Sequence, residues 1–458
     1  MKPDRSSPLP DPRTVGPDVT LPLRFVLAGL VALAVALILL VAQPSLVVQY
    51  HYHQHTVALT HLVLLGFVLS IVSGAAYQLV PVVLETELHS ERLARWHFPI
   101  HVISVAGMVW AFWTWDMKNV GHFGCGLVVG VILLLWNLGR TMLRSRRWNL
   151  ASAGMAASLV MLGLVVLSGL FVAAGKSTYE MVGRPGVNPA LAATLEFLRG
   201  SVGVLSRFDP LGVLHAHAHL GVLGVFVTVT AAVAYRLVPM FLVSDVQSPR
   251  RAALSLALLH AGTLACVLAI LLQAPWKPVA AAITTLALAL YGAEMAAIVR
   301  CRRRRELDWG MRGFLLSQGL LLPVACLGAA LSLPGLTLTE AVGRMENGYA
   351  FLAVMGVLAF AILSMLFKIL PFLVWFAAYR TAIGRHRTPT LQEMCSARVQ
   401  AALSLTWLTG TLLATCGILA GSHPAVRIGA TLLAAALALF AINAALILRH
   451  LVHPKLQP

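Results

Sequence analysis

Long apolar stretches separated by short polar connectors dominate the chain. Segments such as Phe25 to Val41 and Leu432 to Ile442 are apolar all round, so they lack the alternation of apolar and polar residues that a membrane β-barrel requires. A spanning helix needs about 20 predominantly apolar residues. Apolar length then predicts twelve spans, at residues 24–44, 57–84, 98–116, 123–144, 151–174, 213–242, 253–273, 277–300, 311–332, 347–378, 399–420 and 424–448.

The composition agrees with this pattern. Of the 458 residues, 59% are hydrophobic and 11% are charged, whereas a soluble globular chain carries about 25% charge. The sequence therefore predicts an all-α polytopic membrane protein whose main partner is the lipid bilayer. The formal net charge of +17 is typical of Lys and Arg in cytoplasmic loops, so we expect no nucleic-acid partner.

The basic residues are concentrated in alternate connectors and predict an orientation. Arginines follow the fourth, eighth and tenth spans, whereas the connector between Gln43 and Val57 contains neither Lys nor Arg. Because cytoplasmic loops carry the excess of basic residues, we expect both termini in the cytoplasm. The proline-rich residues 1–23 are typical of a disordered cytoplasmic tail.

An internal repeat relates three of the predicted helices. Residues 61–81 and 219–239 each begin with a histidine, have a glycine five residues later, and end with a proline fifteen residues after the glycine. A degraded third copy, residues 351–371, keeps the glycine and the proline but begins with Phe351. The repeat predicts three pseudo-repeated four-helix units within one membrane domain, at residues 24–150, 151–306 and 307–458.

Histidine is the unusual residue type, with sixteen copies against seventeen acidic residues. Close packing explains the repeated glycines. It does not explain histidines in apolar spans, because imidazole in hydrocarbon costs free energy unless it is paired or ligated. Neutral imidazole is a common ligand of copper, zinc and haem iron. The strongest ligand candidates are His61, His215, His219 and His260; His215 and His219 share one helix face.

Six other histidines are weaker ligand candidates, because each also has a structural interpretation. The three in the connector before residue 57 share a face only if the chain is extended, and a solvated outer loop explains them equally well. Two lie near the cytoplasmic end of the third span, and one points away from His215. These residues are His51, His53, His55, His97, His101 and His217.

Twelve helices in three units of four, with histidines on the second, sixth and seventh helices, resemble subunit I of the haem-copper oxidase superfamily. The resemblance implies that His61 is an axial haem ligand. It also implies that His215 or His219 is a copper ligand, together with His260. The tenth helix departs from the family pattern, because it has Tyr349, Phe351 and Met355 and no histidine. A conventional proton-pumping oxygen reductase is therefore not expected.

The His215-Ala-His217 motif is also similar to those of the divergent NnrS-type proteins, which bind haem and copper and act in nitric oxide stress. The leading hypothesis is a haem- and/or copper-binding membrane protein of nitric oxide or electron handling, with a redox partner or second subunit. The second hypothesis is a transporter of copper or of a small molecule, since internal repeats also occur in carriers. The third is a scaffold for a partner subunit.

Overall fold

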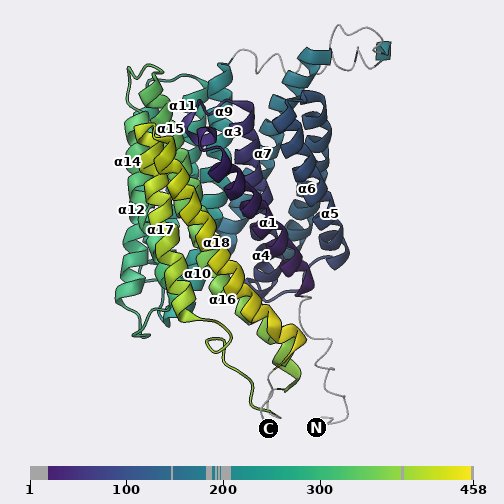
Figure 1. Ribbon diagram of the computed structural model, residues 1–458, viewed down its shortest axis with the longest axis vertical. Helices are drawn as coiled ribbons and strands as arrows, with labels where there is room; N and C mark the ends of the chain where they lie inside the picture. Colours follow the sequence, from purple (N-terminus) through teal and green to yellow (C-terminus); the bar gives the residue numbers. More distant parts are fainter. Residues whose placement is uncertain are drawn as a thin grey trace.

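The computed structural model describes residues 19–145, 148–181, 188–190, 193, 196, 208–382 and 386–454. Within these ranges every regular element is a helix, and the helices form an elongated bundle (Figure 1). Eleven helices are long and apolar enough to cross a membrane. The prediction of a multi-pass helical membrane protein is therefore confirmed. Residues 1–18 of the predicted tail lie outside the described ranges, and the first helix already begins at Thr20.

The helices are named as in Figure 1, and η marks a π or 3-10 segment. Their bounds are α1 Thr20–Ala42, α2 Ser45–Val48, α3 Gln54–His61, η1 Leu62–Leu69, α4 Ser70–Val83, α5 Glu91–Thr114, α6 Met117–Arg144, α7 Leu150–Met181, α9 Pro210–His219, η3 Leu220–Val227, α10 Thr228–Leu242, α11 Pro249–Leu271, α12 Lys277–Arg300, α13 Trp309–Gly319, α14 Leu321–Leu331, α15 Glu340–Phe351, η4 Leu352–Ala359, α16 Phe360–Tyr379, η5 Arg380–Ala382, α17 Ala397–Ala420 and α18 His423–Val452.

Three long helices form the centre of the bundle, and each changes from α to π geometry partway along. They are α3–η1–α4, α9–η3–α10 and α15–η4–α16, which we call the central helices. In their most apolar stretches 67–78% of the residues are buried, against 22–50% in the other candidate spans. Segment η4 packs against both η1 and η3. Such π segments inside α-helices often occur at functional sites.

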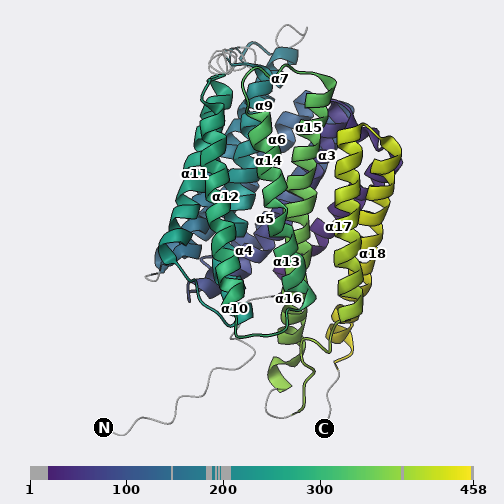
Figure 2. The same ribbon diagram turned by 90° about the vertical axis from the view of Figure 1, so that its left-hand side faces the viewer.

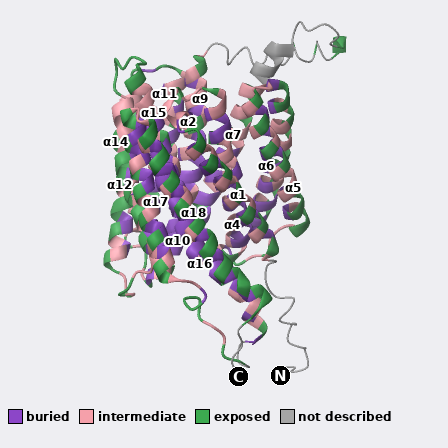
Figure 3. Ribbon diagram, in the orientation of Figure 1, coloured by how far each residue is buried: buried purple, intermediate pink, exposed green. Residues whose placement is uncertain are grey.

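The remaining helices surround the central ones and present apolar side chains outward. Figure 3 shows buried residues in the middle of the bundle and exposed residues on its periphery. Leu27, Ile38 and Trp110 are each about two-thirds exposed, as expected for side chains that face lipid. Helices α17 and α18 pack together along one side of the bundle (Figure 2).

The two ends of the bundle differ in chemistry. The histidine end is the end at which α3, α9 and α15 begin, and it is uppermost in Figure 1. The arginine end is the opposite end, at which α4, α6, α10 and α12 terminate. The amide of Arg303 donates to the carbonyl of Val243, and the Ser145 hydroxyl donates to the carbonyl of Leu84. The basic connectors that follow α12 and α6 therefore both lie at the arginine end.

The same serine cap recurs at the arginine end. Helices α5, α11 and α17 are each N-capped by a serine whose hydroxyl accepts a hydrogen bond from the amide three residues later. The backbone amide of each serine in turn donates to a side chain of the following helix. These pairs are Ser90 with Asn137, Ser248 with Glu294, and Ser396 with Asn443, separated by 47, 46 and 47 residues.

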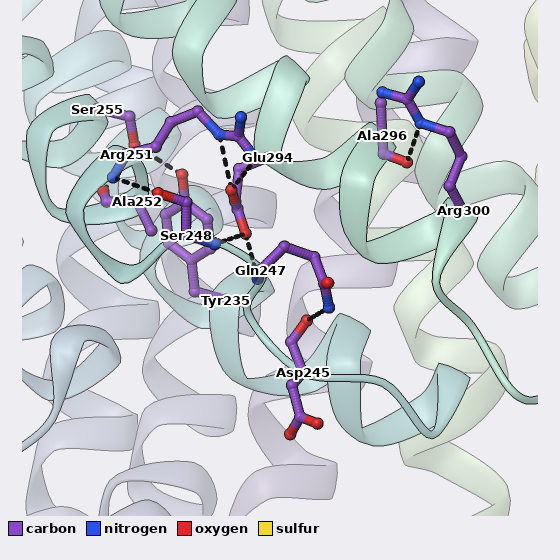
Figure 4. A network of polar contacts seen from close by, with 10 residues as sticks. All are labelled: Tyr235, Asp245, Gln247, Ser248, Arg251, Ala252, Ser255, Glu294, Ala296 and Arg300. Carbon is purple, nitrogen blue, oxygen red and sulfur yellow. Dashed lines mark hydrogen bonds and ion pairs between the residues drawn. The ribbon is translucent and has the colours of Figure 1, made fainter.

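Glu294 makes the most extensive of these contacts (Figure 4). Its carboxylate is fully buried and accepts hydrogen bonds from the amides of Gln247, at 2.6 Å, and Ser248, at 3.0 Å. It also accepts from Nε of Arg251 at 2.7 Å. The carboxylate therefore lies at the N-terminus of α11, where the helix dipole stabilises a negative charge. Because Glu294 belongs to α12, its hydrogen bonds join α12 to α11.

The start of α5 and the continuity of the predicted span 311–332 differ from the sequence prediction for local reasons. Helix α5 begins at Glu91 rather than at residue 98, because Ser90 caps it and its first turns are polar. It is not among the eleven candidate spans. The predicted span 311–332 consists of α13 and α14, which meet at Leu320. Pro323 lacks the amide hydrogen that would continue the helical hydrogen bonding there.

Candidate functional site

A large cavity of about 580 Å³ opens within the histidine end. Its walls come from all three central helices and from α5, α6, α7, α11, α12 and α14, and most of the side chains are aliphatic or aromatic. The ionisable side chains among its lining are few and lie near the starts of the central helices. Apart from Cys266 and Tyr349, they are His51, His61, Asp209, His215, His217, His219, Lys277 and Glu346.

His61 and His219 occupy equivalent places on two central helices. Nδ1 of His61 lies 2.8 Å from the carbonyl oxygen of Val57, and Nδ1 of His219 lies 2.7 Å from that of His215. Since a carbonyl oxygen can only accept, each Nδ1 carries the proton and each Nε2 keeps a free lone pair. Both rings line the cavity, His61 beside Phe112 and His219 beside Tyr349. Each is therefore oriented as a metal-ligating imidazole is.

A second group of side chains gathers where three segments meet. Nε2 of His215 lies 3.0 Å from Nε2 of His51, and Nδ1 of His51 lies 3.5 Å from Oε2 of Glu346. Burial lowers the pKa of His51 below its ordinary value, which favours the neutral ring. Among the described residues, these three form the one group of His, Cys, Asp and Glu side chains that could hold a metal ion.

The connector that carries His51 is held by hydrogen bonds to the helices beside it. Nδ2 of Asn347 donates to the carbonyls of Val47, at 3.0 Å, and Gln49, at 2.6 Å. The hydroxyl of Thr56, near the start of α3, donates to the carbonyl of Leu46 at 2.8 Å. The connector is thereby fixed to α15 and α3, and His51 is placed against Glu346, the neighbour of Asn347.

His217, which the sequence predicts to point away from His215, lines the same cavity as that residue. Its Nδ1 lies 2.9 Å from the hydroxyl of Ser168 on α7. Ser168 also donates to the carbonyl of Val165 at 2.8 Å, so its hydroxyl oxygen accepts from the imidazole. His217 therefore has the same Nδ1-protonated form as His61.

His260 is not among the residues that line the cavity. Its Nδ1 lies 2.7 Å from the carbonyl oxygen of Leu256, and its Nε2 is buried without a hydrogen-bond partner. The copper set of His215, His219 and His260 that the resemblance implies is therefore not gathered at one cavity, and it stays a prediction.

The weaker candidates on α5 have structural contacts. Nδ1 of His97 lies 3.0 Å from the hydroxyl of Tyr77, and Nε2 of His101 lies 2.9 Å from that of Ser70. Both rings are 1% exposed, contact Phe25 and lie outside the cavity lining. These contacts join α5 to the first central helix and favour the structural interpretation.

His53 and His55 also lie outside the cavity lining. His53 is the N-cap of α3, and its Nδ1 accepts from the amide of His55 at 3.3 Å. The ring of His55 stacks on Trp113 with centroids 4.3 Å apart. Both residues therefore stabilise the start of α3, whereas their neighbour His51 faces the cavity.

The third central helix contributes a carboxylate to the site rather than a histidine. Phe351 and Met355 are buried, while Tyr349 and Glu346 line the cavity. Sequence reasoning missed Glu346 because it placed the start of this span at residue 347, whereas α15 begins at Glu340. The available signal was an acidic residue five positions before Phe351, the residue that replaces the repeated histidine.

Comparison with known proteins gives no further guide to the site. The chain matches no protein-family model and no curated protein sequence.

Proposed function

We propose that this protein binds haem in the cavity at the histidine end, with His61 and His219 as the candidate axial ligands. The observation that carries the proposal is their shared geometry. Each ring is held through Nδ1 by the carbonyl four residues earlier, and both line one cavity. Such a hydrogen bond fixes the ring and makes Nε2 more basic, and imidazole is a common axial ligand of haem iron.

The cavity suits a large, mostly apolar cofactor. Its volume of about 580 Å³ falls within the range of about 300–1,000 Å³ that is usual for ligand pockets. Bound haem would supply electron transfer or the binding of a small gas such as nitric oxide. The residues of the chain would orient the haem through the two imidazoles and exclude water with the aliphatic walls.

The wider architecture that we propose is twelve membrane-spanning helices in three four-helix units, residues 24–150, 151–306 and 307–458. Counting α5 with the eleven candidate spans gives twelve. Each π segment begins one residue after an equivalent position, His61, His219 or Phe351. The serine caps recur with nearly constant spacing. These recurrences support the resemblance to haem-copper oxidase subunit I.

Within that superfamily we place the protein among divergent homologues that handle nitric oxide or electrons, such as the NnrS-type proteins. The third central helix has buried Phe351 and Met355 and no histidine, so the second haem of a conventional oxygen reductase lacks its usual ligand. Copper is the other proposed cofactor. His215 and His219 line the cavity and support it, whereas His260 lies outside the lining. Because Nε2 of His219 has one lone pair, this residue would serve either haem or copper and not both at once.

We propose a bacterial inner-membrane location with the arginine end in the cytoplasm. The support is the grouping of the basic connectors at that end, because positively charged loops stay on the cytoplasmic side. The cavity and its histidines then face the periplasm, where a redox partner or a second subunit would meet them.

The proposal is tested by purifying the protein from cells supplied with haem and copper. We expect a Soret absorption band, a pyridine haemochrome spectrum and about one haem per chain. The variants His61→Ala and His219→Ala are each expected to lose most of the haem, whereas His122→Ala, an exposed residue of α6, retains it. Wild-type protein without a Soret band, or His61→Ala and His219→Ala with full haem content, would contradict the proposal.

A transporter of copper or of a small molecule is the second candidate function. It is favoured by the size of the cavity and by the π segments that interrupt all three central helices beside it, since carriers bind substrate near interrupted helices. The variant His219→Ala separates the two functions. If the variant loses a chromophore that the wild type binds, haem binding is supported. If the wild type binds no chromophore and the variant loses uptake of copper or of a small molecule into proteoliposomes, transport is supported.

A further inference from the structure

Three side chains from distant parts of the sequence converge at the histidine end of the cavity. His51 lies in the connector between α2 and α3, His215 on α9 and Glu346 on α15. One ligand atom from each lies within 4.8 Å of the other two. The two imidazoles approach with Nε2 atoms 3.0 Å apart. This separation suits two ligands of one ion, because metal–nitrogen distances are about 2.0–2.1 Å.

Two polar atoms of this cluster are not satisfied by the protein, although the Nε2 atoms of His51 and His215 hydrogen-bond to each other. Oε2 of Glu346 and Nδ1 of His51 are both buried, and neither makes a hydrogen bond. Their 3.5 Å separation exceeds an ordinary N–H···O hydrogen bond. A buried carboxylate oxygen without a donor costs free energy, and a cation bound between the three groups would remove that cost.

We propose that His51, His215 and Glu346 form a site for one divalent transition-metal ion of the Zn²⁺ and Cu²⁺ class. Two imidazoles and a carboxylate suit these borderline ions better than Mg²⁺ or Ca²⁺, which take oxygen ligands, or Cu⁺, which prefers sulfur. The site is separate from the proposed haem ligands, because it uses neither His61 nor His219. It deepens the proposed copper binding, with which it shares His215, by naming His51 and Glu346 as the other ligands.

Access and an open coordination position follow from the geometry. The side chains of His51 and Glu346 are 17% and 23% exposed, so an ion can enter from solvent. All three groups also line the cavity. Zinc sites with three protein ligands keep a fourth position for water or substrate, and here a fourth ligand would come from the cavity or from solvent. His215 also connects the metal site with the haem site, because its carbonyl oxygen orients His219.

The test is a titration of the full-length, detergent-purified protein after treatment with EDTA, made without added haem. Zn²⁺ is the probe, and binding is followed by isothermal titration calorimetry and by elemental analysis after gel filtration. We expect one tightly bound Zn²⁺ per chain. The variants His215→Ala and Glu346→Gln are expected to weaken binding by at least about 10- to 100-fold, because removing only a group that orients a metal ligand already costs that much.

Glu340→Gln is the matched control, because Glu340 lies on the same helix but is 85% exposed and pairs with Arg344. It is expected to bind Zn²⁺ as the wild type does. Co²⁺ gives a second readout that is independent of affinity. We expect visible absorption bands of bound Co²⁺ in the wild type, and we expect the His215→Ala variant to lack these bands while its helix content is unchanged. Equal Zn²⁺ binding in all variants, or none in the wild type, overturns the proposal. Haem content is measured separately, so the two proposals fail independently.

Discussion

At the scale of single residues, Asn347 shows how a side chain that is not itself a ligand positions the site. It is 7% exposed, and its amide nitrogen donates to the carbonyls of Val47 and Gln49. Replacing it by Leu leaves both acceptors without their partner in a largely buried place, which costs about 1–3 kcal/mol. We therefore expect Asn347→Leu to lower the midpoint of thermal unfolding in detergent and to weaken Zn²⁺ binding, because the connector that carries His51 is released.

The control for this prediction is Asn119→Leu, an exposed residue of α6 whose side chain bonds to Asp116 and His122 near the start of the same helix. It should leave Zn²⁺ binding unchanged. Wild-type Zn²⁺ affinity in Asn347→Leu would show that His51 is positioned without help from α15.

Glu294 carries a second prediction at the residue scale. Its buried carboxylate accepts from two backbone amides and from Arg251. Removing one partner of a buried ion pair typically costs about 3–5 kcal/mol, so Glu294→Ala is expected to unfold at a clearly lower temperature. Glu294→Gln is expected to be milder, because the amide oxygen still accepts from Gln247 and Ser248.

The comparison of these two variants is made by thermal unfolding followed by circular dichroism. Equal losses for Glu294→Ala and Glu294→Gln would mean that the charge, rather than the acceptor oxygen, determines stability. Asn137 and Asn443 perform the same capping role without a charge, which is the physical reason to expect the milder result.

At the scale of helices, the repeated glycines predict unequal effects at equivalent positions. A Cβ on Gly66 would lie 2.9 Å from Cβ of Ala32 on α1, whereas a Cβ on Gly224 would lie 3.4 Å from the flexible Met161 side chain. Overpacking typically costs about 1–3 kcal/mol, while Ala exceeds Gly in helix propensity by about 1 kcal/mol. We therefore expect Gly66→Ala to lower the unfolding midpoint and Gly224→Ala to leave it unchanged or raise it. Equal effects would contradict this packing.

The helices themselves were largely predictable, because lipid-facing and buried positions are both apolar and long apolar stretches are unambiguous. The π segments were not, since Leu62–Leu69 is an apolar run that would read equally well as α-helix. The start of α5 was missed for a related reason. Glu91 and its polar neighbours in the first turns of the helix lower the hydropathy of a segment whose start is set by the Ser90 cap.

At the scale of the whole molecule, the candidate site was only half visible in the sequence. His61, His215, His219 and His260 stood out as imidazoles in apolar spans, and the first three line the cavity. His51 was only a weaker candidate and Glu346 was no candidate, because their roles depend on three segments far apart in the chain meeting in space. Spacing along a helix shows which residues share its face, but it does not show which connector folds over the end of the bundle.

The orientation of the molecule in the membrane gives the last prediction. Lys118 is exposed at the start of α6. This position lies beside the histidine end, because Gln54 of α3 donates to the carbonyl of Trp113 at the end of the preceding helix, α5. Arg305 is exposed at the arginine end, after α12. In a chain without its native cysteines, we expect Lys118→Cys to react with a membrane-impermeant maleimide in intact spheroplasts. Arg305→Cys should react only after lysis, since basic loops stay in the cytoplasm. The reverse pattern would place the cavity and its metal site on the cytoplasmic side.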